Sequence, residues 1–461
     1  MTSVRAMAVS GQFYPDQANV LSSLVDSFYA NAETPALTHC PKVLVVPHAG
    51  MRFSGDTAAK AYALIKPFSS RIKRVVMFGP SHRVAFSGIA MEPADYVRTP
   101  LGDIPVNRDG VAALLEEGLL ISSAQAHAQE HSLEVQWPFL QAVLDDFTLT
   151  PLVVGEAGKV QVAEVIARLW GGDETLIVIS TDLSHFHPVQ ACEQIDAETC
   201  GKVRSAKSDL GGQQACGFKG LNGALYLASS YAWDVRQVDY SHSAQKGASP
   251  DRVVGYGSFF IDVPQAFEAT RFQTFEAQER VSLLQLARSS IDKVLHGNKL
   301  EINVDDYPAH LMFKGAAFVS LHKHGNLRGC IGSLAAHQAL AVDVMQNSVK
   351  AAFNDPRFPK LALEELAELE IEISILSRPE PLPCSGEEDC LKKLRPGIDG
   401  LIIQSGSRRA TFLPLVWRSL TEPAMFLKHL KQKAGMQVDA WPADMQVWRY
   451  EAICFSEREF A

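Results

Sequence analysis

Three apolar runs of this sequence each end in side chains that can bind a metal or transfer a proton. These side chains are His48, His82, and the pair Asp182 and His185. Imidazole nitrogens and carboxylate oxygens are natural donors for divalent iron, zinc or copper, and two histidines with one anionic ligand and open positions suit iron that activates oxygen. We therefore predict His48 and His82 as metal ligands. Asp182 and His185 are predicted to complete the coordination, to orient a ligand imidazole, or to act as catalytic acid and base.

A second polar cluster, 130-EHSLE-134, opens a stretch with helical character. Within it, His131 and Glu134 are spaced i and i+3, so both can lie on one helix face and point into the same cleft. We predict that both act in catalysis. Any one histidine taken alone is more often a hydrogen-bonded structural residue. The coincidence of several histidines at strand ends is what favours a functional site.

The apolar runs that precede these side chains are short, rich in Val and Ile, and stopped by Gly, Pro or a polar residue, as buried strands are. Segments with a helical period fall between them. This alternation predicts an α/β domain with a mostly parallel central sheet and helices on both faces. In such a sheet, ligands bind outside the carboxyl ends of the strands, so the side chains that follow the strands meet at one edge. The predicted strands are 42–47, 73–79, 149–155 and 175–181, and the predicted helices are 18–32, 56–68, 109–118 and 160–170.

The alternating pattern lapses around residues 263–278, and the order of elements changes beyond that point. This second part of the chain begins with an amphipathic helix and mixes hairpin, helix and strand, which predicts a smaller α+β domain. We therefore predict one domain over 1–264, a linker over 265–276 and a second domain over 277–461. The predicted elements of the second domain are a helix over 279–297, a hairpin over 315–334, a helix over 338–353, and strands over 369–376 and 400–406.

Length and composition agree with two globular domains. A chain of 461 residues with 47% hydrophobic residues can bury more than one core. The 43 basic and 52 acidic residues give a net charge of −9 without a Lys/Arg-rich run, so nucleic acid is not an expected partner. The first residues lack the pattern of a signal peptide, and no long uncharged apolar stretch occurs, so we expect a cytoplasmic protein that does not associate with membranes.

The remaining cysteine and histidine residues are given structural interpretations. Eight cysteines are scattered along the chain without a C-x-x-C pair, which indicates reduced thiols rather than a disulfide framework or a zinc ribbon. Cys216 is interpreted as a buried structural thiol, because no base is paired with it in the sequence. His127 and His187 are interpreted as surface residues.

The sequence lacks the motifs of several other classes of binding site and enzyme. The chain has no Walker-type phosphate loop, and its glycines do not follow a strand with dinucleotide-binding spacing, so ATP and NAD are not favoured. A Ser-His-Asp hydrolase fits the composition, but no Gly-x-Ser-x-Gly elbow presents a serine.

Six ordered motifs in residues 1–262 together resemble the Memo-like family, also called AmmeMemoRadiSam system protein B. Members of that family look like class III extradiol ring-cleaving dioxygenases in fold, so the resemblance implies an iron-type pocket. The motifs are 47-PHAG-50, 79-GPSH-82, 99-TPLG-102, 130-EHSLEVQWPFL-140, 180-STDLSH-185 and 255-GYG-257.

The resemblance also implies roles for particular residues. It implies metal ligation by the first two strand-end histidines, His48 and His82, with Asp182 and His185 lining the same cavity. Animal relatives supply a cysteine from the loop before the last strand, whereas the corresponding loop here, 239–257, contains none. His242 lies in that loop and either substitutes as a metal ligand or is a surface histidine.

The second half, residues 276–461, resembles the AMMECR family, or AmmeMemoRadiSam system protein A. Independently of this resemblance, Arg328 and Cys330 lie among glycines that let backbone N–H groups approach an acidic ligand, which predicts a ligand-binding turn. Asp355 and Arg357 are interpreted as a pair that fixes a turn. The carrying motifs are 327-LRGCIGS-333, 351-AAFNDPRFPKLALEEL-366, 371-IEISILS-377 and 397-GIDGLIIQSGSRRATFLPLVW-417.

Both families are named for genomic co-occurrence with a radical S-adenosylmethionine protein, so the fusion implies that the two halves act in one pathway. No C-x3-C-x2-C motif occurs, so that partner is expected to be encoded separately. The expected function is a dioxygenase-like oxidoreductase acting on a small molecule or a protein, with iron(II) as the metal and copper or zinc as alternatives. The alternatives are a catalytically idle binding module and a metal-dependent hydrolase.

Overall fold

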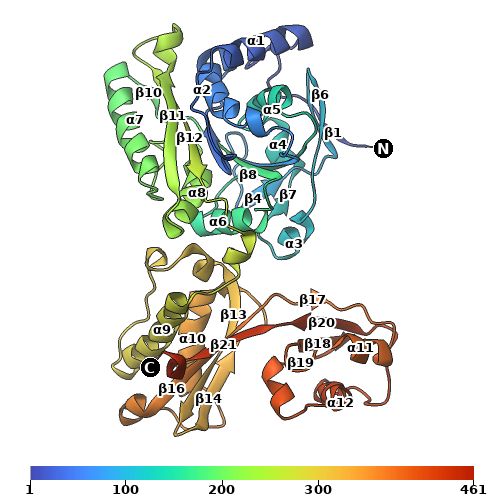
Figure 1. Cartoon of the computed structure of the whole chain (residues 1–461). Coiled ribbons are helices and arrows are strands. Elements are labelled where there is room, and N and C mark those ends of the chain that lie inside the picture. Colours follow the sequence, from blue (N-terminus) through green and yellow to red (C-terminus); the bar gives the residue numbers. More distant parts are fainter. Residues whose placement is uncertain (1, 461) are drawn as a thin grey trace. The chain divides into compact units, whose positions relative to one another are not determined.

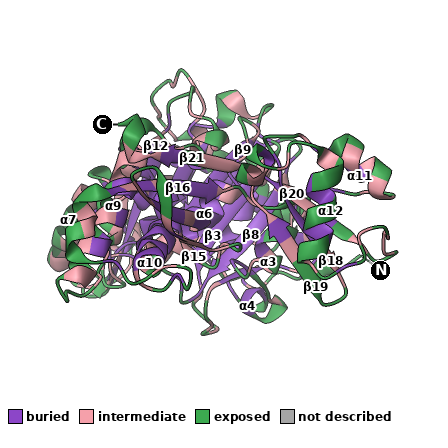
Figure 2. Ribbon diagram, turned by 90° about the horizontal axis from the view of Figure 1, so that it is seen from below, coloured by how far each residue is buried: buried purple, intermediate pink, exposed green. Residues whose placement is uncertain are grey.

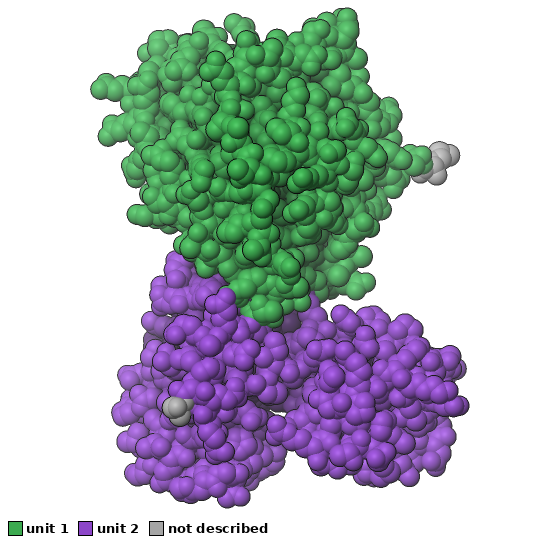
Figure 3. Space-filling model, in the orientation of Figure 1, with its two compact units in different colours: residues 1–274 green, residues 275–461 purple. Residues whose placement is uncertain are grey.

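The computed structural model describes residues 2–460 and divides the chain into two compact units, Met1–Thr274 and Phe275–Ala461 (Figure 3). Each unit contains its own β-sheets and its own buried core. The division falls within the segment 265–276, where the sequence pattern changes.

A nine-stranded mixed sheet forms the centre of the N-terminal unit (Figure 1). Its four middle strands are parallel, and the strands beside them are antiparallel. The predicted parallel sheet is thus found at the centre, whereas the flanks differ because β11 and β12 pair as neighbouring antiparallel strands. The order is β10 (His185–His187), β12 (Val253–Asp262), β2 (Val43–Val46), β9 (Thr175–Ser180), β3 (Arg74–Pro80), β8 (Thr148–Val154), β4 (Ile89–Met91) and β7 (Ile121–Ser122), with β11 (Asp234–His242) paired to β12.

The middle strands end at a common level, and this level defines the site. Every residue of β2 and β9 is buried, which explains their continuous Val, Leu and Ile content. In the parallel register, Val46 lies opposite Ser180, and Phe78 lies opposite Ile179. The residues that follow β2, β9 and β3 therefore emerge at the same edge of the sheet, as the sequence predicted.

Helices cover both faces of this sheet. Helices α1, α2 and α5 pack on one another and share a core with β2 and β3, while α6 packs on α8, which contacts β3 and β9. Figure 2 shows the middle strands buried and helix α7 partly exposed. The helices are α1 (Ala18–Ala30), α2 (Met51–Ala63), α3 (Val111–Glu116), α4 (Ala124–Ala128), α5 (Trp137–Val143), α6 (Lys159–Arg168), α7 (Val189–Arg204) and α8 (Phe218–Ser230).

Helix α2 differs from its predicted range of 56–68. It begins at Met51, directly after the strand-end motif, and ends at Ala63. Pro67 lacks an N–H group and cannot continue the helix, so Lys66–Phe68 form a separate 3-10 turn. The early start brings the first turn of α2 close to the residues that follow β2.

A small three-stranded sheet of β1 (Val4–Arg5), β5 (Tyr96–Thr99) and β6 (Gly102–Pro105) holds the N-terminal segment. A buried ion pair of 2.6 Å between Arg5 and Glu134 fixes that segment further. Burial of such a pair requires that its remaining donors and acceptors be satisfied. Arg5 also donates to the carbonyl oxygens of His127 and Glu130.

The C-terminal unit has the predicted α+β character, with antiparallel pairing in both of its sheets. The predicted hairpin turns at His324 and Gly325, whose positive φ angles of 51° and 80° suit a two-residue turn. One sheet has the order β14 (Asn326–Gly332), β13 (Lys314–Lys323), β16 (Leu369–Leu376), β21 (Ala452–Ser456), with β15 (Gln338–Ala339) paired to β13; the other has the order β17 (Glu380–Pro381), β20 (Gln446–Tyr450), β18 (Gly400–Ser405), β19 (Arg408–Phe412). The helices are α9 (Ala277–Leu295), α10 (Leu340–Phe353), α11 (Glu387–Lys393) and α12 (Pro423–Lys433).

Two expectations concern the whole chain. All eight cysteines are free thiols, as their scattered spacing indicated. Among residues 2–460, none of the helices combines the length and the apolar character needed to cross a bilayer.

His127 was expected at the surface, and the structure corrects this interpretation. Its side chain is 1% exposed, and its Nε2 lies 2.9 Å from the carbonyl oxygen of Ala90. A carbonyl oxygen can only accept, so Nε2 carries the proton. Burial lowers the pKa of His127 to about 4, which keeps the ring neutral at ordinary pH.

This buried histidine predicts an acid-sensitive stability. The unfolded chain takes up the proton near pH 6.5, whereas the folded chain takes it up near pH 4. Stability is therefore fully present above pH 6.5 and is lost as the pH falls towards 4, by about 3 kcal/mol for this one group. The measurement is denaturant unfolding of the full chain at several pH values, beside His127→Gln, which keeps an N–H donor and does not titrate. We expect the variant to lose less stability over this range; equal losses in the two proteins would contradict the assignment.

Candidate metal centre

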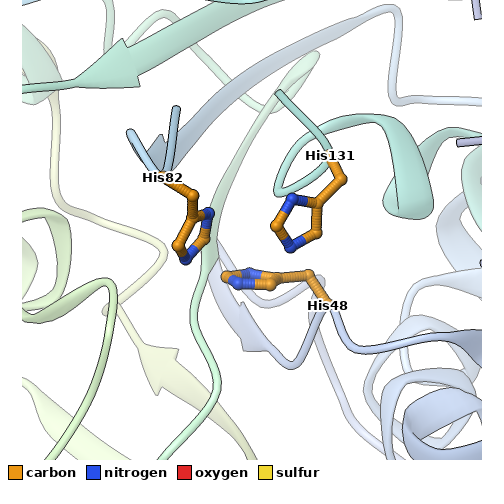
Figure 4. A group of neighbouring side chains, drawn as sticks. All are labelled: His48, His82 and His131. Carbon is orange, nitrogen blue, oxygen red and sulfur yellow. The ribbon is translucent and has the colours of Figure 1, made fainter. Parts of the chain in front are cut away.

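Three imidazole rings face a common space at the edge of the nine-stranded sheet (Figure 4). Each of His48, His82 and His131 offers one nitrogen, and these nitrogens all lie within 4.8 Å of one another. Histidine nitrogens bind metals at about 2.0–2.1 Å, which places neighbouring ligand nitrogens roughly 3–4 Å apart. The three rings therefore need only small movements to hold one ion.

Hydrogen bonds fix the protonation of His48. Its Nδ1 lies 2.9 Å from the Ser180 hydroxyl oxygen. That hydroxyl donates its only hydrogen to the Ser132 carbonyl at 2.6 Å, and it accepts from Gln136. Since Ser180 has no second hydrogen, Nδ1 of His48 must donate to it. Nε2 of His48 consequently keeps its lone pair for a metal.

The Glu130 carboxylate fixes the protonation of His82 in the same way. It accepts from Nδ1 of His82 at 2.9 Å and from three backbone N–H groups, those of His82, His131 and Ser132. Burial alone raises the pKa of Glu130, but these hydrogen bonds outweigh it and hold the pKa well below its usual range. The carboxylate stays ionised, and a carboxylate behind a ligand histidine orients the ring and raises its basicity.

His131 was predicted as a catalytic residue, and the structure places it with the two predicted ligands. Its ring stacks against that of His82 with centroids 4.6 Å apart, and it packs on Phe13 at 4.7 Å. Nδ1 of His131 lies 3.3 Å from Glu130 but is not aligned for a hydrogen bond. The donor set therefore consists of three imidazoles and does not include the carboxylate that the sequence suggested.

The electrostatics keep the rings of His48 and His131 neutral, as metal binding requires. Burial, followed by the neighbouring rings of His82 and His131, lowers the pKa of His48 well below its ordinary value. Burial also lowers the pKa of His131, although Glu130 opposes the effect. Little proton competition is thus expected at these two rings at neutral pH, and the three imidazoles fit a divalent ion.

Asp182 lies close to His48. Its Oδ1 accepts from the backbone N–H groups of His48 at 2.7 Å and Ala49 at 3.2 Å, and Oδ2 lies 4.0 Å from Nε2 of His48. Burial raises its pKa, while the nearby imidazole of His185 and the N–H donors oppose the shift. Asp182 therefore fixes the turn that carries His48.

The backbone next to His185 is irregular. His185 begins β10, and the next residue, Phe186, has a positive φ of 61° beside a register shift against β12. Such a conformation is costly for a bulky residue and is found where structure around it enforces it. Nδ1 of His185 donates to the Leu183 carbonyl at 2.8 Å, which leaves Nε2 as a proton acceptor.

Two predicted site residues do not join the three rings. Glu134 is fully buried, and its carboxylate accepts from Arg5, Tyr14 and the backbone of Ala8 and Val9. His242 is buried at the end of β11, where Nε2 lies 3.4 Å from Glu193. The contacts of Glu134 hold the N-terminal segment.

Cys216, interpreted from the sequence as a structural thiol, lies beside the centre. Its sulfur is 3.4 Å from Nε2 of His48 and accepts from the backbone N–H of Asp182. The next residue must be Gly217, because a Cβ there would lie 2.6 Å from the Ser180 carbonyl oxygen. Burial raises the pKa of Cys216 to about 12, so the free thiol is protonated.

In the C-terminal unit, Arg328 lies in strand β14 and not in the predicted turn. Its guanidinium binds both carboxylate oxygens of Glu365, at 3.0 and 2.9 Å. The N–H of Cys330 donates to Asp355, which pairs with Arg357 as the sequence indicated. An anionic ligand at Arg328 would have to displace Glu365.

Comparison with known proteins covers both units. The family model described as Memo-like protein matches residues 5–260, and the model AMMECR1 matches residues 284–455. A MEMO1 family protein of Thermoplasma volcanium is 29% identical over 267 residues, which is 55% of this chain and 97% of that protein. A MEMO1 family protein of Archaeoglobus fulgidus is 30% identical over 272 residues, covering 56% and 100% of the two chains. Among solved structures, an uncharacterized protein of Pyrococcus horikoshii is 33% identical, with TM-score 0.36, and covers 38% of this chain and 89% of that one.

The three-imidazole centre predicts a clear order of metal affinities. His131→Ala and His48→Ala should each weaken Co(II) binding by about 100-fold or more, because each removes one of three donors. His242→Ala is the control and should bind Co(II) like the unaltered protein. The measurement is titration of the full chain with Co(II) against a competing chelator. An effect of His242→Ala with none from His131→Ala would contradict the centre as described.

Proposed function

Since this chain belongs to the Memo-like protein family through residues 5–260, we propose that its N-terminal unit is a metal-dependent oxidoreductase. The observation that carries the proposal is the cluster of His48, His82 and His131. Three imidazoles occupy only part of the coordination sphere of a divalent ion. When bound there, iron(II) supplies redox chemistry at the positions left open.

The protein groups around the centre have distinct tasks. His185 has an unprotonated Nε2 and can accept a proton from a substrate hydroxyl. Asp182 holds the backbone of His48 and Ala49 and so restrains the turn that carries His48. Glu130 and Ser180 hold the outer nitrogens of two ligand rings. Catalysis here depends on this preorganisation.

A second candidate function follows from the donor set itself. Three neutral histidines with an open position also form a catalytic zinc site, in which a water molecule is the nucleophile. Among the described residues, the group of candidate metal ligands consists of three imidazoles and contains no carboxylate. A zinc-dependent hydrolase is therefore the alternative to iron-dependent oxidation.

The C-terminal AMMECR1 domain suggests a shared pathway rather than a second reaction of known type. Its presence in the same chain supports coupling of the two domains. We propose that a separate radical S-adenosylmethionine protein acts in that pathway, on the family resemblance stated above. Co-purification of this chain with such a protein from its own source tests the association.

The reaction class can be tested by metal reconstitution. Metal-free full chain is reloaded without oxygen, either with iron(II) or with zinc. We expect the iron(II) form to consume oxygen with a catechol probe above the rate of free iron, because open coordination positions are available only in the loaded centre. Oxygen-independent hydrolysis of a nitrophenyl ester by the zinc form would instead support the hydrolase, and no turnover by either form would leave a binding module.

His185→Gln isolates the proposed base. It should keep its metal content and lose about 100-fold or more in turnover, since general bases contribute 10²–10⁴-fold. The double variant His48→Ala/His82→Ala is the reference that loses metal and activity together. Full activity of metal-loaded His185→Gln would remove His185 from the reaction.

A further inference from the structure

A cavity of about 430 Å³ opens beside the candidate metal centre. Three segments line it: the loop from Pro80 to Phe86, residues 154–156 at the end of β8, and residues 216–220 at the start of α8. His82 and Cys216 belong to this lining, and both also contact the metal centre. The cavity therefore borders the group of three rings through His82 and Cys216.

The walls of this cavity are preorganised. The backbone N–H of Glu156 donates to the Phe86 carbonyl, and the backbone N–H of Gly155 donates to the Gly88 carbonyl. A Cβ at Gly155 would lie 2.3 Å from the Phe86 carbonyl oxygen, so only glycine allows this approach. Ser81 closes the loop with a 2.6 Å hydrogen bond to the Val84 carbonyl. A rigid cavity binds its ligand at a low entropic cost.

Charged groups in the lining are mainly basic. Arg83 is exposed to the cavity, and within residues 2–460 no carboxylate pairs with it. Lys219 also lines the cavity and pairs with Glu156, which is mostly exposed, at 2.6 Å. The first turn of α8 adds partial positive charge from its N–H groups. A divalent ion at the three histidines would increase the positive potential further.

Apolar surface complements these charges. Phe86 and Phe218 stand in the lining, and the Lys219 ammonium lies 5.6 Å from the centre of the Phe218 ring. An aromatic wall next to cationic groups suits a molecule with one apolar part and one anionic part.

We propose that this cavity is the substrate pocket of the N-terminal unit and that it selects a small organic anion. The anionic group faces Arg83 and Lys219, the apolar body packs on Phe86 and Phe218, and the reacting end points past His82 towards the metal centre. This assignment rests on the proposed function, because it takes the three histidines as the place of reaction.

The test compares benzoate with benzamide, two probes of nearly equal shape that differ in charge. Calorimetric titration uses the full chain loaded with Co(II). We expect benzoate to bind about five-fold more tightly or better, the size of one charge-assisted contact. Arg83→Gln should reduce this preference to within about two-fold. The matched control is Arg98→Gln, which removes an exposed arginine that pairs with Asp103 elsewhere on the unit, and it should keep the preference.

Additional ligands and variants distinguish the possible results of this test. Phenyl phosphate in place of benzoate tells whether a carboxylate or a phosphate fits better, and tighter binding of either than of benzamide supports the proposal. Lys219→Gln with Glu156→Gln removes the ion pair without leaving a lone carboxylate, and it should also weaken benzoate binding. Equal affinities for benzoate and benzamide, or a preference that survives Arg83→Gln, would overturn the proposal even if Co(II) binds. Loss of Co(II) binding with the anion preference intact would instead contradict the proposed function.

Discussion

The buried Glu130 carboxylate is the interaction on which the centre depends. Removing a carboxylate from water is costly unless hydrogen bonds replace the lost hydration. Here four N–H groups do so, from the His82 ring and from the backbones of His82, His131 and Ser132. The bonds join the end of β3 to a segment 48 residues further along the chain. These hydrogen bonds therefore bring His131 against His82. The two histidines do not share a helix or a strand that would do so.

The sheet supplies the other half of the arrangement. Parallel strands of matched register deliver His48, His82 and Asp182 to one edge. The segment of His131 then has to lie on the end of β3, and Gly79 permits this, because a Cβ there would lie 2.7 Å from the Ser132 hydroxyl. Ser132 in turn donates to the Pro80 carbonyl and, through its own carbonyl, holds Ser180. Backbone packing and ligand orientation thus form one network.

The sequence predicted those parts of the site that depend on local pattern. Val- and Ile-rich runs marked the middle strands, and the residues after them marked His48, His82 and Asp182. The grouping of His131 with Glu134 failed because the helix starts only at Trp137, after a 3-10 turn, so the two side chains diverge. Cys216 could not be found, since only the tertiary approach of Gly217 to Ser180 places it beside His48. The turn predicted around Arg328 is instead part of strand β14, because glycines in a strand resemble glycines in a turn.

Anomalous diffraction from crystals of the full chain grown with Co(II) tests whether the three histidines bind one metal ion. Data collected above and below the cobalt edge locate the ion without reference to activity. We expect one strong peak in the N-terminal unit, about 2.0–2.2 Å from one nitrogen each of His48, His82 and His131. A peak between His242 and Glu193, or no peak at the three rings, would contradict it.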